Sequence, residues 1–218
     1  MKCTLILAAL IITSVSTISI AQTDSIPEAK PSRERLGVRI GYSATSNNLK
    51  ESFGSGVNLA LHFVTNIKKP LSIDITLGAI YLGSTDNEIT RDFFGMEFDS
   101  VTMRILMLTA APMLELPIGD RTDIYVSAGL GFYASSLILD QSLNEFDLTN
   151  NHYGVNAGAG IFRRIFTNWY LDFGVSLHKF WTDDKYDPYD PDWIFLYSGG
   201  DSDPLFWTVT GGAALGLF

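Results

Sequence analysis

Several charged and polar residues that could take part in chemistry share one phase of an alternating pattern. The set comprises Arg39, Asn58, His62, Asp74, Arg104, Asp172, Ser176 and His178. Successive side chains of a strand point to opposite faces, so these residues are expected on the polar faces of strands, inside a closed barrel. A buried charge without a partner costs several kcal/mol, so the charges there should be paired. We predict that Arg39 pairs with Asp74 or Asp172, and that His62 hydrogen-bonds toward Thr76 or Asp74.

A catalytic alternative concerns two histidines near the ends of later strands. His152 and His178 are expected on neighbouring strands, near Ser135 and Asp183, where a base could activate a nucleophile against a lipid. Their offset along the strands is roughly 7 to 13 Å at about 3.3 Å per residue, too far for a hydrogen-bonded pair. We therefore expect a structural polar network in the lumen and no catalytic residues.

An acidic segment, TDDKYDPYDPDWIFLYSGGDSDP, occupies residues 182–204. Dense carboxylates could hold Ca²⁺, but the segment lacks EF-hand spacing, and acidic loops are usually just solvated. We expect no metal and no cofactor. Its Tyr and Trp residues suggest a contact surface more than its acids do. Such a loop could bind a surface ligand, a neighbouring lipopolysaccharide through bridging cations, or nothing. The formal net charge of −9 disfavours a nucleic-acid partner.

Strands are the elements that must position these residues, because apolar residues recur at every second position. From Leu71 the odd positions to Tyr81 are apolar, and the even ones begin Ser72, Asp74, Thr76 and Gly78. Segments beginning near residues 36, 57, 124 and 169 alternate in the same way, and 100–116, 152–166 and 205–218 do so less cleanly. Eight strands result, an even number that can close without an unpaired edge. We predict an all-β, eight-stranded antiparallel up-and-down transmembrane β-barrel.

The connections between the strands alternate in length. Links at 67–70, 117–120 and 166–168 are short, whereas those at 44–55, 84–99, 139–151 and 182–204 are long, which is typical of an outer-membrane barrel with short periplasmic turns. This topology predicts two girdles of outward aromatic residues. The long-loop girdle comprises Tyr42, Tyr81, Phe132, Tyr153, Trp181 and Phe206, and the short-turn girdle comprises Phe63, Trp169 and Phe218.

The N-terminus has the pattern of an export signal. Lys2 precedes an apolar run, and Ser19-Ile20-Ala21 is a small-x-small cleavage site. We expect a signal peptide at 1–21 cleaved after Ala21, a flexible periplasmic segment at 22–35, and the barrel at 36–218. The single cysteine, Cys3, would leave with the signal peptide.

Over about residues 36–218 the chain resembles the small OmpA-like and OmpX-like outer-membrane barrels. Its C-terminus, WTVTGGAALGLF, ends in Phe218, similar to the family's recognition signal for the barrel-assembly machinery, although Gly216 and Ala214 replace the usual large residues. The resemblance implies a Gram-negative outer membrane, contact with its lipid, and assembly through the last strand. We expect a non-enzymatic integral protein serving surface interaction or envelope integrity. The alternatives are an outer-membrane lipid-modifying enzyme and a soluble lipocalin-like ligand-binding barrel.

Overall fold

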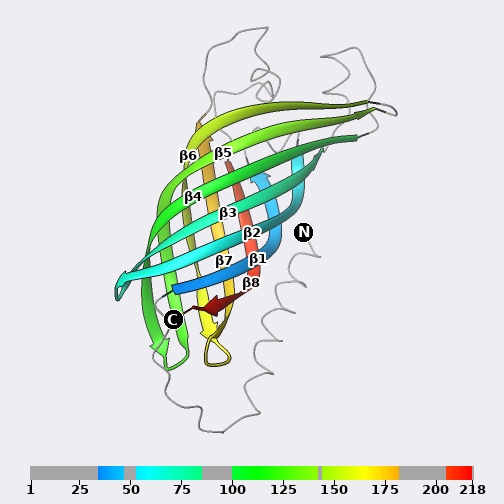
Figure 1. Ribbon diagram of the computed structural model, residues 1–218. Helices are drawn as coiled ribbons and strands as arrows, with labels where there is room; N and C mark the ends of the chain where they lie inside the picture. Colours follow the sequence, from blue (N-terminus) through cyan, green and yellow to red (C-terminus); the bar gives the residue numbers. More distant parts are fainter. Residues whose placement is uncertain (1–33, 47–52, 85–99, 142–143, 182–204, 218) are drawn as a thin grey trace. The chain divides into compact units, whose positions relative to one another are not determined.

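The computed structural model describes residues 34–46, 53–84, 100–141, 144–181 and 205–217, and they form eight antiparallel strands (Figure 1). Each strand pairs with its sequence neighbours, and β8 pairs with β1 to close the barrel. The predicted eight-stranded up-and-down transmembrane barrel is therefore confirmed. The strands are β1 (Glu34–Ser46), β2 (Phe53–Lys68), β3 (Leu71–Ser84), β4 (Ser100–Gly119), β5 (Thr122–Gln141), β6 (Asn144–Arg164), β7 (Trp169–Trp181) and β8 (Leu205–Gly216).

The outer wall of the barrel is apolar, and the buried charged groups all point into the interior, as the alternation in β3 illustrates. Leu77 is 60% exposed on the outer face, whereas its neighbour Thr76 is 8% exposed and points inward. Asp74 and Asp172 are also buried inside, at 7% and 0% exposure. A soluble ligand-binding barrel has the opposite polarity, with the apolar face inward, so the lipocalin-like alternative is wrong. An apolar outer wall is what hydrocarbon requires of a membrane barrel.

Three short connections join the strands at one end, here called the short-turn rim. They lie at residues 69–70, 120–121 and 165–168, where the sequence predicts short links. At the opposite end, the long-loop rim, the chain leaves the strands for residues 47–52, 85–99 and 182–204. Those segments lie outside the described residues, as do the predicted signal peptide, the N-terminal segment up to residue 33, and Phe218. Within the described part, no helix is long and apolar enough to cross a membrane.

The prediction of a long loop at 139–151 is wrong. Strand β5 continues to Gln141 and β6 begins at Asn144, and these two residues are paired across the hairpin. The cause lies in the sequence, since Leu137, Ile138 and Leu139 continue β5 as an apolar run, and Phe146 and Leu148 alternate with polar residues in β6. Continuing the ladder also satisfies backbone donors and acceptors that a loop would leave to water. Figure 1 shows these two strands reaching further than their neighbours at this end.

Most of the predicted girdle residues point outward. Tyr42, Tyr81, Phe132, Tyr153, Trp169 and Trp181 are exposed on the outer face, and Phe63 lies half-buried beside outward Leu36 and Ile75. Phe206 does not belong with them, because its side chain is fully buried inside the barrel. The outward aromatic of β8 is Trp207, whose ring centroid lies 5.9 Å from that of Tyr42. Residues 205, 206 and 207 are all apolar, so the sequence pattern does not show which of them point outward. The register with β1 determines this.

Candidate functional site

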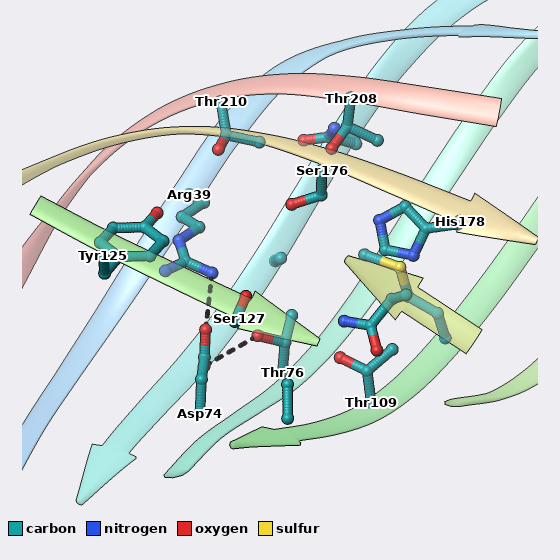
Figure 2. Close-up of a pocket in the computed structure, with 15 residues that line it drawn as sticks. Arg39, Asp74, Thr76, Thr109, Tyr125, Ser127, Ser176, His178, Thr208 and Thr210 are labelled. Carbon is teal, nitrogen blue, oxygen red and sulfur yellow. Dashed lines mark hydrogen bonds and ion pairs between the residues drawn. The ribbon is translucent and has the colours of Figure 1, made fainter. Parts of the chain in front are cut away.

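The guanidinium of Arg39 lies at the centre of a polar cluster in the barrel interior. Arg39 of β1 donates from Nε to Asp172 Oδ2 at 2.5 Å and from Nη1 to Asp74 Oδ2 at 3.2 Å. The Tyr125 hydroxyl donates to Asp172 Oδ1 at 3.0 Å, and Thr76 Oγ1 donates to Asp74 Oδ1 at 3.1 Å. Figure 2 shows Arg39 and Asp74 facing each other across the lumen. The expected pairing of Arg39 is present, and it involves both carboxylates rather than one. These five residues are here called the Arg39 cluster.

His62 lies beside the Arg39 cluster but makes a different contact from the one predicted. Its register partner Thr76 donates to Asp74 instead, and neither ring nitrogen of His62 makes a hydrogen bond within the described part of the chain. Its Nε2 lies 3.5 Å from Asp172 Oδ2, and its ring stacks on Phe162 with centroids 6.2 Å apart. Gly37 makes room for the imidazole, since a Cβ there would lie 2.2 Å from Nε2. The predicted bond to Thr76 or Asp74 is therefore wrong.

A second buried ion pair lies nearer the short-turn rim and was not predicted. Arg35 donates from Nη2 to Glu115 Oε1, which also accepts from Ser72 Oγ at 2.6 Å. The Arg35 guanidinium lies 4.2 Å above the centroid of Phe162. Sequence reasoning assigned Arg35 to the flexible lead-in, although it shares the parity of Arg39. β1 in fact begins at Glu34, so both arginines point into the lumen.

The half of the lumen nearer the long-loop rim is aromatic and apolar rather than polar. Tyr133, Phe180 and Phe206 pack with His152 and His178, and the five are here called the aromatic plug. The rings of His178 and Phe206 stack at 4.8 Å, and those of His152 and Phe180 at 4.9 Å. His178 belongs to this plug, where its Nδ1 is 3.1 Å from the Tyr133 hydroxyl. Around them lie buried apolar side chains of β2, β3 and β4, namely Phe53, Ala60, Ile80, Leu82, Met103, Ile105 and Met107.

A small polar chamber lies among these groups, with a volume of about 30 Å³. Figure 2 shows hydroxyl side chains around it, contributed by Thr76, Thr109, Ser127, Ser176, Thr208 and Thr210. Asn58 and Asn156 also line it, and their Oδ1 atoms, like Arg39 Nη2, have no hydrogen-bond partner among the described residues. A water molecule needs roughly 10–15 Å³ of such space, so the chamber has room for about two. Small side chains at this level separate the Arg39 cluster from the plug.

Arg104 is not in the lumen, so that prediction is wrong. The inward positions of β4 are odd-numbered, with Met103 and Ile105 buried inside. Arg104 therefore lies on the outer face, opposite Tyr81 of β3, and its Nη2 donates to Ser136 Oγ at 3.3 Å. It lies four residues from Ser100, the first residue of β4, and therefore toward the long-loop rim.

His152 and His178, the two histidines of the catalytic alternative, do not contact the same residue. Ser135 Oγ lies 2.9 Å from His152 Nε2, while His178 contacts Tyr133. Such a serine–histidine pair could in principle generate a nucleophile. However, Ser135 is fully buried, and His152, which stacks on Phe180, is only 6% exposed. Asp183 lies outside the described residues, and within them no group of histidine, cysteine and acidic side chains could hold a metal ion.

Comparison with known proteins reveals similarity in structure only. No family model and no curated protein sequence matches the chain. Neisserial surface protein A superposes with a TM-score of 0.58 at 12% identity, covering 85% of this chain and 98% of that one. OprG of Pseudomonas aeruginosa gives a TM-score of 0.49 at 10% identity, covering 87% and 99%. The described strands close into the same kind of barrel, and the chain therefore has the fold of the eight-stranded outer-membrane β-barrels.

Proposed function

We propose that this chain is an integral protein of a bacterial outer membrane that acts through its outer surface and loops, and is neither a pore nor an enzyme. The observation that carries this proposal is an interior occupied by buried side chains within an apolar outer wall. The apolar wall accounts for membrane insertion, and an occupied interior leaves the exterior as the place of interaction. A role in surface interaction or envelope integrity follows.

Three layers of buried side chains in the barrel interior support the absence of a pore. The Arg35–Glu115 pair, the Arg39 cluster and the aromatic plug follow one another from the short-turn rim to the long-loop rim. Tyr133, Phe180 and Phe206 are each 1% exposed or less, so these rings are packed against other side chains on all sides. An eight-stranded barrel is just wide enough for side chains to fill it, and these residues do so.

Burial argues against the lipid-modifying enzyme. A nucleophile must reach the scissile bond, and catalytic groups must lie within hydrogen-bond distance of the reacting atoms. Ser135 has no exposed surface, and Phe180 stacks on the His152 ring. The hydrogen bond between Ser135 and His152 is better explained as mutual satisfaction of two buried polar groups.

The extended β5–β6 hairpin supports a role for the surface. The last residue of β7, Trp181, pairs with Tyr153, so β6 continues beyond β7 through residues 144–152. At about 3.4 Å per residue this extension is roughly 30 Å long. We infer that a paired hairpin of this length is a place of contact with molecules outside the membrane. The acidic segment 182–204 is part of the same proposal as a place for a surface ligand.

Fractionation and conductance together test the proposal. We expect the mature protein in the detergent-extracted outer membrane, with a mobility on gels that changes on heating, and we expect no steady conductance in planar bilayers. As a matched pair, His152→Ala and Tyr153→Ala should leave the lipid A profile of cells unchanged. Recovery from the soluble periplasm, stable ion conductance by the unmodified barrel, or a lipid A change specific to His152→Ala would each overturn the corresponding part.

A further inference from the structure

The polar chamber between the Arg39 cluster and the aromatic plug is built by the whole barrel. Each of the eight strands contributes at least one side chain to its lining, from Arg39 on β1 to Thr208 and Thr210 on β8. Arg39 is 8% exposed, Asn58 2% and Thr208 3%, so these polar side chains are largely removed from bulk water. Hydrogen-bonding groups in such a place need partners inside the barrel.

Three buried polar atoms of the lining have no hydrogen-bond partner among the described residues. One is a donor, Arg39 Nη2, and two are acceptors, Asn58 Oδ1 and Asn156 Oδ1. Other atoms of the same side chains hold two of them in place. Arg39 Nε and Nη1 donate to the two carboxylates of the Arg39 cluster, and Asn58 Nδ2 donates to Ser43 Oγ at 3.1 Å. Because buried polar groups are almost always hydrogen-bonded, these atoms require a partner that is not part of the chain.

The combination of one donor with two acceptors restricts the kind of partner. A monovalent cation would bind the two amide oxygens but would be repelled by the guanidinium. Chloride would accept from the guanidinium but could not donate to the amide oxygens. Water both accepts and donates, so it can satisfy all of these atoms. The chamber has a volume of about 30 Å³, and a water molecule needs roughly 10–15 Å³ of such space, so about two water molecules fit and a larger solute does not.

We propose that the chamber is a binding site for structural water, in which about two molecules accept from Arg39 Nη2 and donate to Asn58 Oδ1 and Asn156 Oδ1. The bound water joins the Arg39 cluster of β1, β3, β5 and β7 to the amides of β2 and β6. The hydroxyl side chains of the lining supply the remaining donors and acceptors. The hydrogen-bonded network then involves strands all around the barrel. The inference depends on the barrel interior alone, and not on the location or function proposed above.

Radiolytic footprinting of the folded barrel in detergent tests the site, because an X-ray pulse generates hydroxyl radicals from bound water as well as from bulk water. Three inward methionines of β4 report the result. Met107 lines the chamber and is 6% exposed, whereas Met103 and Met113, at 2% and 1%, do not line it. Met103 lies nearer the long-loop rim and Met113 nearer the short-turn rim, so a radical entering from either end would meet one of them first.

We expect the yield of methionine sulfoxide at Met107 to exceed that at Met103 and Met113 about fivefold or more. Dissolved hydrogen peroxide acts from bulk solution, and it should leave all three methionines unreacted in a matched exposure. Equal radiolytic yields at the three positions, or preferential attack of peroxide on Met107, would overturn the proposal.

Variants of the two asparagines make the result specific. Replacing both, in Asn58→Leu with Asn156→Leu, removes the two unpaired acceptors, and a small apolar cavity stays dry. The yield at Met107 should then fall to that at Met103. Asn66→Leu makes the same change on β2 at a residue that does not line the chamber, and it should leave the yield at Met107 unchanged. An unchanged yield in the double variant would contradict the proposal. Heat-dependent gel mobility shows which variants fold, and Asn156→Leu alone replaces the double variant if that one does not.

Exchange of salt separates water from an ion as the occupant. Folding and irradiation in choline gluconate instead of sodium chloride should give the same yield at Met107. A yield that changes with the salt would identify a sodium or chloride ion in the chamber and overturn the assignment to water.

Discussion

Replacing Arg39 by glutamine should destabilise the barrel more than any change to an exposed charge. The side chain is 8% exposed and its nitrogens contact two carboxylates, at 2.5 Å and 3.2 Å. Without the guanidinium, Asp172 and Asp74 stay buried as neighbouring negative charges at 0% and 7% exposure. Removing one partner of a buried ion pair costs about 3–5 kcal/mol, because the remaining charge is uncompensated. We expect the free energy of unfolding to fall by that amount in Arg39→Gln.

The assay is urea unfolding of the barrel in phospholipid vesicles, followed by tryptophan fluorescence. The free energy is extrapolated to zero denaturant for each variant. Arg121→Gln, at an exposed turn, is the matched control and should lie within about 0.5 kcal/mol of the unmodified chain. The double variant Arg39→Gln with Asp172→Asn should recover much of the lost free energy of unfolding, because one of the two uncompensated buried charges is removed. The reasoning is refuted if Arg39→Gln costs less than about 1 kcal/mol, the value of an exposed pair.

Three further predictions use the same unfolding assay. Leu77→Arg, at an outward position that is 60% exposed, should cost about 2–4 kcal/mol in vesicles, and a negligible cost would mean that this face does not meet hydrocarbon. Gly37→Val should cost about 1–3 kcal/mol by overpacking, because a Cβ there lies 2.2 Å from His62 Nε2. Gly83→Ala, with nothing within 4 Å of the added Cβ, is its control and should be neutral. Phe180→Ala should cost about 3–5 kcal/mol if the plug is packed as tightly as a protein core, and under 1 kcal/mol would contradict that packing.

The barrel could be predicted from the sequence because period-two alternation is strong where one face meets lipid. In β3 the apolar positions from Leu71 to Tyr81 are unbroken, and the inward positions carry Asp74 and Thr76. The pairing of Arg39 with Asp74 or Asp172 could be predicted for a related reason, although the sequence did not indicate that both carboxylates would take part. Once parity and strand direction are assigned, few residues of opposite charge share its level inside the barrel.

The parts of the interior that escaped prediction lie where both faces of a strand are apolar. In β4, Met103 and Ile105 point inward while Leu106 and Leu108 point outward, so composition does not reveal the face of Arg104. The same ambiguity at residues 205–207 concealed that Phe206 belongs to the plug. Where the interior of a membrane barrel is apolar, the strand is apolar on both faces, and its sequence resembles that of a fully buried strand without alternation. Only strand register, which depends on long-range pairing, separates the two faces.

Spin-label accessibility at two neighbouring positions tests the central claim most directly. The sequence contains a single cysteine, Cys3, so in a background with Cys3 replaced, labels at Thr76→Cys and Leu77→Cys are unambiguous. Apolar oxygen dissolves in the bilayer, so the label at 77 should collide with it frequently, whereas the label at 76, inside the barrel, should be shielded. A label at 77 that is reached by a water-soluble paramagnetic reagent while that at 76 is reached by oxygen would contradict the outward orientation of the apolar faces.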